Sequence, residues 1–260
     1  MEYEIIDFHT HPFILDSENI CAHKNCANMG KEFTLELFNA LNVKTFCGSV
    51  LSSRSSKETS VLEIITKNNQ TALELKRFYG DRYYPGFHVH PAYVDYSISV
   101  IDNMVKNGFK LIGELVPYFH SWSSYAEQGL NAILDYAGDK GVIVNFHTQD
   151  HENAIKMVKN HKNVIFVGAH PGEKPDIEYH LRLAKECENY YIDLSGYGVH
   201  RFGAIKTIVN GFGINRVLYG SDYPTCSPAT FIGAITGETL LTSSEKQAIL
   251  YKNAKTLLNI

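Results

Sequence analysis

The feature that most constrains the fold is a regular alternation of β-rich runs and amphipathic helical segments. Eight short runs are rich in β-branched and aromatic residues, at 5–9, 44–50, 84–90, 110–116, 142–147, 164–169, 190–194 and 216–220. Segments with apolar residues at helical spacing lie between them, for example at 61–78, 96–106, 126–137, 151–159 and 177–187. Strands that alternate with helices pair in parallel through right-handed crossovers.

The number of runs and the chain length together predict one closed (β/α)8 barrel, a TIM barrel, over residues 1–260. Such barrels reach about 250 residues as a single domain. An open, doubly wound sheet is the alternative, but no Gly-x-Gly-x-x-Gly pattern follows any of the runs. The closing segment, residues 243–260, predicts a final helix packed on the outside of the barrel.

Composition excludes several classes of partner. The net charge is −4 and no block of lysine and arginine occurs, which argues against a nucleic acid or an anionic membrane as the main partner. We find no signal peptide and no apolar run of about 18 residues, so a cytoplasmic protein without a membrane span is expected. The five cysteines are scattered and expected to be reduced, and a homo-oligomer stays open. Cys21, His23 and Cys26 offer a small metal or redox loop, although an ordinary loop is favoured.

His9 and His11 follow the apolar run that opens the chain, in the stretch IIDFHTHPF. Side chains at i and i+2 of a strand point to the same face, about 6–7 Å apart. Two imidazoles at that separation can converge on one metal ion, although two solvated histidines at a strand end would give the same pattern. Pro12 marks the place where strand pairing ends.

Other strand runs also carry an imidazole or a carboxylate near their carboxyl ends. In a (β/α)8 barrel the active site forms at these ends, where the βα loops gather. A lone histidine on a strand is more often a hydrogen-bonded structural residue, but five strands that each deliver such a group are unlike a chance scatter. Besides the two histidines of the first strand, these groups are Glu114, His147, His170 and Asp222.

These motifs resemble the amidohydrolase superfamily, and most closely its amidohydrolase-related (amidohydrolase 2) branch of metal-dependent barrels. The resemblance is carried by the His-x-His of the first strand, the Gly-Glu of the fourth, the histidines of the fifth and sixth, and YGSDYP at the eighth. The closing ILYKNAKTLLNI also resembles the last helix of that branch.

The resemblance implies that His9 and His11 are primary ligands and that His147 and Asp222 complete a site around one divalent ion. A bound ion of this kind lowers the pKa of water from about 15.7 to roughly 7. Asp222 would take up the proton as the general base and pass it to the leaving group. Zn²⁺ is the first candidate, and Mn²⁺, Fe²⁺ and Ni²⁺ suit the same donors.

The resemblance leaves the number of ions at one or two. His170 would either bind a second ion or act catalytically without metal, through a hydrogen bond to the water or the substrate. Glu114 would bridge two ions, as a strand-four carboxylate does in two-ion relatives, or it would only orient a ligand histidine.

Three residues are candidates for binding the substrate. Arg201 and Arg54 lie in segments that follow strand runs and could clamp an anionic group, but a solvated surface arginine is an equal alternative. His90 belongs to a second His-x-His, at which the resemblance places no metal, and a hydrogen-bonded core histidine is favoured there.

The expected function is a metal-dependent hydrolase that uses metal-activated water on a C–N or C–O bond of a small-molecule amide, lactone or ester. Two alternatives remain: a non-hydrolytic, metal-dependent decarboxylase of the same branch, and a metal-containing barrel that binds a ligand without turnover.

Overall fold

The computed structural model describes residues 3–22, 28–52 and 59–260. Eight strands form one parallel sheet in which the spatial order equals the order along the chain. Hydrogen bonds from the amide of Phe8 to the carbonyl of Tyr219 (2.9 Å) and from Asp222 to His9 (2.9 Å) join its two edges, so the sheet closes into a (β/α)8 barrel. The strands are β1 Ile5–Asp7, β2 Val43–Ser49, β3 Tyr83–Phe87, β4 Leu111–Leu115, β5 Ile143–His147, β6 Ile165–Ala169, β7 Tyr190–Asp193 and β8 Val217–Leu218.

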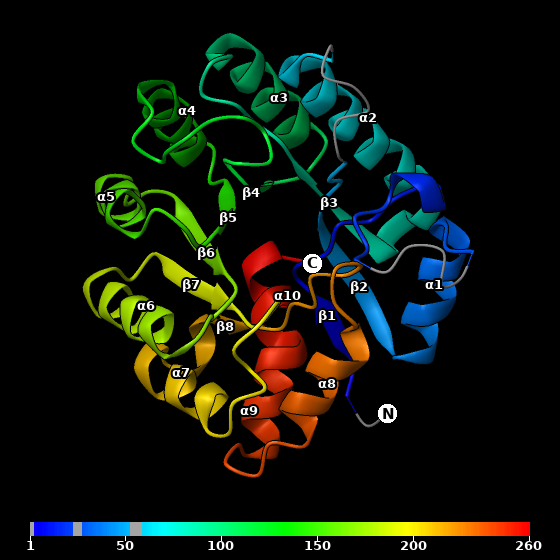
Figure 1. The fold of residues 1–260 in the computed structure, drawn as a ribbon, viewed down its shortest axis with the longest axis vertical. Helices are drawn as coiled ribbons and strands as arrows, with labels where there is room; N and C mark the ends of the chain where they lie inside the picture. Colours follow the sequence, from blue (N-terminus) through cyan, green and yellow to red (C-terminus); the bar gives the residue numbers. More distant parts are fainter. Residues whose placement is uncertain (1–2, 23–27, 53–58) are drawn as a thin grey trace.

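Helices surround the ring of strands (Figure 1). Apart from that of the last helix, their apolar faces pack on the outer side of the sheet and contribute to the larger of two hydrophobic clusters. The helices are α1 Lys31–Ala40, α2 Val61–Tyr79, α3 Val94–Lys106, α4 Gln128–Asp139, α5 His151–Asn160, α6 Lys174–Glu186, α7 Ala204–Phe212, α8 Pro228–Thr236, α9 Ser243–Gln247 and α10 Asn253–Leu258. No helix in the described ranges is both long and apolar enough to cross a membrane.

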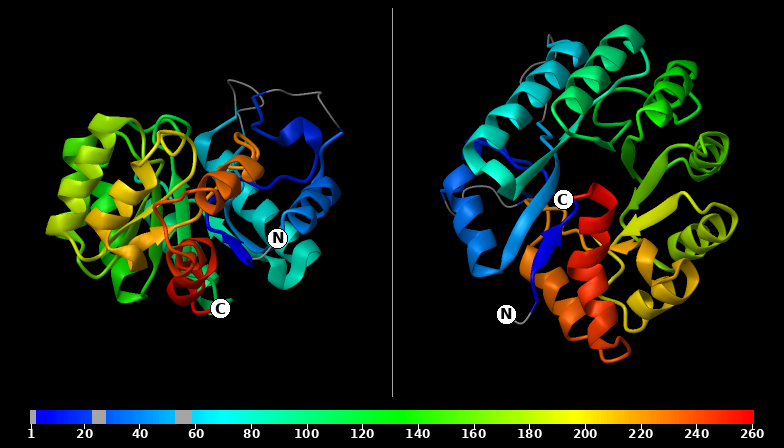
Figure 2. Two further views of the ribbon diagram at one scale, coloured as in Figure 1. Left: turned by 90° about the horizontal axis from the view of Figure 1, so that it is seen from below. Right: turned by 180° about the vertical axis from the view of Figure 1, so that it is seen from behind.

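The closing segment differs from its prediction. A π-helical turn, Ala248–Lys252, separates α9 from α10, so the segment is not one regular helix. Ala254 and Leu258 of α10 pack with Ile6, Leu111 and other residues from the amino-terminal parts of the strands, and α10 lies across the middle of the ring in Figures 1 and 2. The segment therefore caps the amino-terminal end of the barrel, and the expectation of a helix on its outer side is wrong.

The cap follows from the apolar spacing within α10. Ala254 and Leu258 are four residues apart and therefore share one helical face. That face covers side chains that would otherwise meet water at the open end of the barrel, and the opposite, carboxyl end of the strands remains for chemistry.

Candidate metal centre

His9 and His11 follow β1 and meet side by side, with their Nε2 atoms 3.2 Å apart. The Nδ1 atom of His9 lies 2.9 Å from Oδ2 of Asp193, and that of His11 lies 3.0 Å from the carbonyl oxygen of Ser49. Carboxylate and carbonyl oxygens only accept, so each Nδ1 carries the hydrogen. In the neutral rings, both Nε2 lone pairs therefore face the same point, as two ligands of one ion require.

Glu114 lies between two pairs of histidines and is almost completely buried. Its Oε2 is 3.5 Å from Nε2 of His9 and 3.4 Å from Nε2 of His11. Its Oε1 is 2.8 Å from Nδ1 of His147 and 3.4 Å from Nε2 of His170. Each carboxylate oxygen thus faces a different pair of rings, which is the placement that a bridging ligand needs.

Asp222 and His170 reach the centre from loops that directly follow β8 and β6. Both have left-handed backbones, with φ of 62° and 65°, which is uncommon outside glycine and typical of functional sites. Oδ1 of Asp222 lies 3.5 Å from Nε2 of His11 and 3.8 Å from Nε2 of His9. A side chain at Gly220 would come within 2.7 Å of Cβ of His9, so glycine is required there for close packing.

The donor atoms form three overlapping sets that could hold a metal ion. Imidazole nitrogens and carboxylate oxygens are donors that Zn²⁺ and other divalent transition metals accept, so the residues present fit such an ion. The structure groups His147 with Glu114 and His170, whereas the one-ion arrangement implied by the resemblance groups it with His9 and His11. The sets are His9, His11, Glu114; Glu114, His147, His170; and His9, His170, Asp222.

The electrostatics of the site show why a cation would be held. Burial lowers the pKa of His11, but hydrogen bonds with Asp222 and Glu114 outweigh burial and raise it to about 9. Burial raises the pKa of Glu114, yet the charges of His9 and His147 bring it well below its ordinary value. The carboxylate of Glu114 therefore remains charged in a buried site, and a divalent cation would replace the protons on the ring nitrogens.

A comparison with protein families agrees with this geometry. The model of the family Amidohydro_2, described as "Amidohydrolase", matches residues 55–260. The chain belongs to the amidohydrolase family. A search of curated proteins finds no match.

Solved structures with the same fold include proteins whose names indicate different chemistries. One is a 2,6-dihydroxybenzoate decarboxylase from Rhizobium, with a TM-score of 0.75 and 13% identity over 99% of each chain. Another is a manganese-containing 5-carboxyvanillate decarboxylase mutant from Novosphingobium aromaticivorans, with a TM-score of 0.75 and 13% identity over 100% of this chain and 98% of that one. A third is a protein provisionally assigned as a 2-pyrone-4,6-dicarboxylic acid hydrolase of Pseudomonas putida, with a TM-score of 0.74 and 14% identity over 100% of this chain and 98% of that one. At these identities the similarity shows the fold alone.

A cavity of about 510 Å³ opens over the centre of the amidohydrolase barrel. Tyr118 and Tyr197 line it, with side chains more than half exposed, and their rings contact His147 and His170. No lysine or arginine of the described ranges is among its lining residues. The candidate ligands that face this cavity are His11, Glu114, His147, His170 and Asp222.

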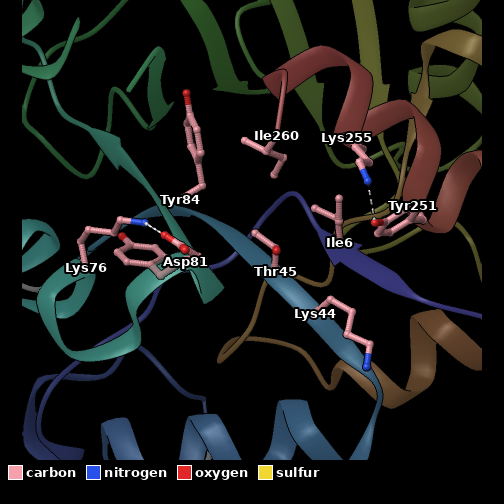
Figure 3. Close-up of a pocket in the computed structure, with 10 residues that line it drawn as sticks. Ile6, Lys44, Thr45, Lys76, Asp81, Tyr84, Tyr251, Lys255 and Ile260 are labelled. Atoms are coloured by element: carbon pink, nitrogen blue, oxygen red, sulfur yellow. Dashed lines mark hydrogen bonds and ion pairs between the residues drawn. The ribbon is translucent and has the colours of Figure 1, made fainter. Parts of the chain in front are cut away.

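A second cavity, of about 370 Å³, lies at the opposite end of the barrel beside β2, β3 and α10 (Figure 3). Lys76 lies 3.5 Å from Asp81, and Lys255 lies 3.1 Å from the hydroxyl of Tyr251. No histidine of the described residues lines this cavity. Within the described residues, the groups of side chains that could hold a metal ion lie at the carboxyl end of the strands.

The structure places two of the predicted substrate-binding residues, Arg201 and His90, away from the metal centre. Arg201 is exposed and makes two hydrogen bonds of 3.1 Å to Glu173, so its guanidinium is already occupied by a surface carboxylate. His90 is buried, with Nε2 3.1 Å from the carbonyl oxygen of His120 and Nδ1 accepting from the amide of Ala92, which matches the core alternative. Neither lines the cavity. Arg54, like His23 and Cys26, lies outside the described residues.

Sequence reasoning missed Asp193 and Ser195, although both contact candidate ligands. Asp193 is the last residue of β7, and Ser195 lies two positions later. Their position at and just after the carboxyl end of the seventh strand is the signal that could have identified them.

Proposed function

We propose that this chain is a metal-dependent hydrolase that cleaves a C–N or C–O bond of a small molecule such as an amide, lactone or ester. The observation that carries the proposal is the position of Glu114, whose two oxygens face two separate pairs of imidazoles. A structural site would have no need of the cavity above these groups.

His9, His11 and Asp222 would hold one ion, His147 and His170 a second, and Glu114 would be shared. When bound, such ions polarise a carbonyl oxygen and supply hydroxide near neutral pH. Zn²⁺ is our first candidate because nitrogen and carboxylate donors suit it, with Mn²⁺ as the alternative. We also propose a cytoplasmic location, which suits a chain whose five cysteines are scattered and form no Cys-x-x-Cys pair.

Asp222 would act as the general base. Its Oδ1 faces the rings of His9 and His11, while Oδ2 lies 4.0 Å from the thiol of Cys226, also at the cavity. One carboxylate can therefore face the ligand rings and still accept a proton from water on the cavity side, then return it to the leaving group. His170, which also lines the cavity, would bind an ion or hydrogen-bond the substrate oxygen.

The test is turnover of a panel of lactones, amides and esters by protein reconstituted with Zn²⁺ or Mn²⁺. We expect metal-dependent hydrolysis that incorporates ¹⁸O from labelled water into the product. Binding of panel compounds without turnover under any metal would contradict the proposal and favour a ligand-binding barrel.

A decarboxylase is the second candidate, favoured by the presence of decarboxylases among the proteins with the same fold. Release of CO₂ from an aromatic acid, with no ¹⁸O in the organic product, would identify this reaction. The described residues that line the cavity include no cation to pair with a free carboxylate, which is why we place hydrolysis first.

A further inference from the structure

Asp193 is connected to both halves of the candidate metal centre and is completely buried. Its Oδ2 accepts hydrogen bonds from Nδ1 of His9 at 2.9 Å and from the side-chain amide of Asn145 at 3.0 Å. Its Oδ1 accepts from the backbone amide of Ser195 at 3.1 Å and from the Ser195 hydroxyl. One oxygen therefore orients a candidate ligand, and the other orients a serine.

Ser195 passes this orientation on to His170. Its Oγ lies 3.0 Å from Nδ1 of His170. A serine hydroxyl has a single hydrogen, and the carboxylate of Asp193 can only accept, so the hydrogen of Ser195 points to Asp193. Oγ then accepts from Nδ1–H of His170, and the Nε2 lone pair of His170 is left toward Oε1 of Glu114, 3.4 Å away.

The backbone after Ser195 is shaped to the same ring. Gly196 has a φ of 71°, and a side-chain carbon there would overlap the imidazole of His170. The hydroxyl of Ser195 thus contacts His170, and Gly196 leaves the space that the imidazole ring of His170 occupies.

We propose that Asp193 and Ser195 are positioning residues that fix His9 and His170 in the same tautomer, with Nδ1 protonated, and thereby couple the two halves of the centre. The inference rests on the proposed function, because the shared tautomer is useful only if both Nε2 atoms bind an ion or the substrate. Mutation of the residue that hydrogen-bonds a ligand histidine typically lowers metal affinity by about 10–100-fold.

The test compares Ser195→Ala with Ser97→Ala. Ser97 is an equally buried serine of α3 whose hydroxyl bonds to the backbone of Tyr93 and His90 and not to a candidate ligand. Zn²⁺ affinity is measured by chelator competition, and zinc content by elemental analysis. We expect Ser195→Ala to bind the second ion about 10–100-fold more weakly, with Ser97→Ala unchanged. The ion at His9, His11 and Asp222 should be weakened less, because Nδ1 of His9 loses a contact of 3.2 Å to Ser195 but keeps its bond of 2.9 Å to Asp193. Asp193→Asn should weaken both ions.

The second readout does not depend on zinc or on turnover. Long-range ¹H–¹⁵N spectra of the histidine rings report which nitrogen carries the hydrogen. Wild-type His170 should show the Nδ1–H form, and Ser195→Ala should lose this preference while Ser97→Ala keeps it. Wild-type zinc affinity together with an unchanged His170 spectrum in Ser195→Ala would overturn the inference. If Ser195→Ala changes the tautomer of His170 as expected but the wild-type protein binds no zinc, the proposed function alone would be overturned.

Discussion

At the scale of single residues, Asp222 has the most exacting role, because it would face the ligand rings and also exchange a proton with water. Asp222→Asn keeps the size and the backbone but removes the basic oxygen. We expect kcat to fall by about 10²–10⁴-fold, the usual contribution of a general base. Steady-state kinetics on any substrate found in the panel measures this, with Asp135→Asn on the outer surface as the control. Retention of full activity would remove Asp222 from the mechanism.

Substitution of Gly196 tests whether the His170 ring needs the space beside this glycine. Gly196→Ala and Gly203→Ala both place a side chain on a left-handed backbone, with φ of 71° and 80°, at about 1–2 kcal/mol of stability each. Only the first substitution meets the ring of His170, since nothing lies within 4 Å of the second. We therefore expect the backbone strain to destabilise both variants, with a larger loss in thermal unfolding for Gly196→Ala, and a loss of metal and activity only in Gly196→Ala. Equal activity in the two variants would contradict the fit.

At the scale of elements, α10 is the cap of the barrel. Leu258→Ala removes a buried side chain from the cluster that closes the amino-terminal end and should cost about 2–5 kcal/mol of unfolding free energy. The half-exposed Leu240 provides the control, where the same change should cost far less. Urea unfolding of both variants measures the difference. The kcat of folded Leu258→Ala should remain near wild type, because the metal centre lies at the other end.

His88, directly after β3, should make stability depend on pH. Burial lowers its pKa to about 4, although Nε2 donates to the carbonyl of Val50, and the ring of His120 lies 4.5 Å away. The folded chain keeps His88 neutral while the unfolded chain binds a proton below pH 6.5, so this residue costs stability as the pH falls from about 6.5 to about 4. The total is about 3 kcal/mol at 1.36 kcal/mol per pKa unit.

The variant His88→Gln retains a donor near the Nε2 position and has no group that titrates in this range. We therefore expect the unfolding free energy of the wild type to fall more than that of the variant as the pH is lowered from 7 to 4.5. A constant difference across that range would contradict the burial argument.

The elements also show what could be read from the sequence. Eight alternating runs predicted the barrel, which is confirmed, and the strand ends predicted which side chains meet, because parallel strands bring their carboxyl ends to one side. The pairing around Glu114 could not be predicted, since it depends on the side-chain torsions of His147 and His170. The role of α10 was missed because the spacing of its apolar residues is the same whether the helix packs beside a barrel or across its end.

At the scale of the whole molecule, the barrel brings together six donor side chains that lie between positions 9 and 222 of the sequence. The proposed enzyme requires these side chains to hold divalent ions, with Glu114 shared between them. The metal content of the purified chain, after reconstitution with Zn²⁺ and removal of loosely bound ions, tests this most directly. We predict two ions per chain, and about one in Glu114→Gln. A wild-type protein that retains no ion, either as purified or after reconstitution, would contradict the account.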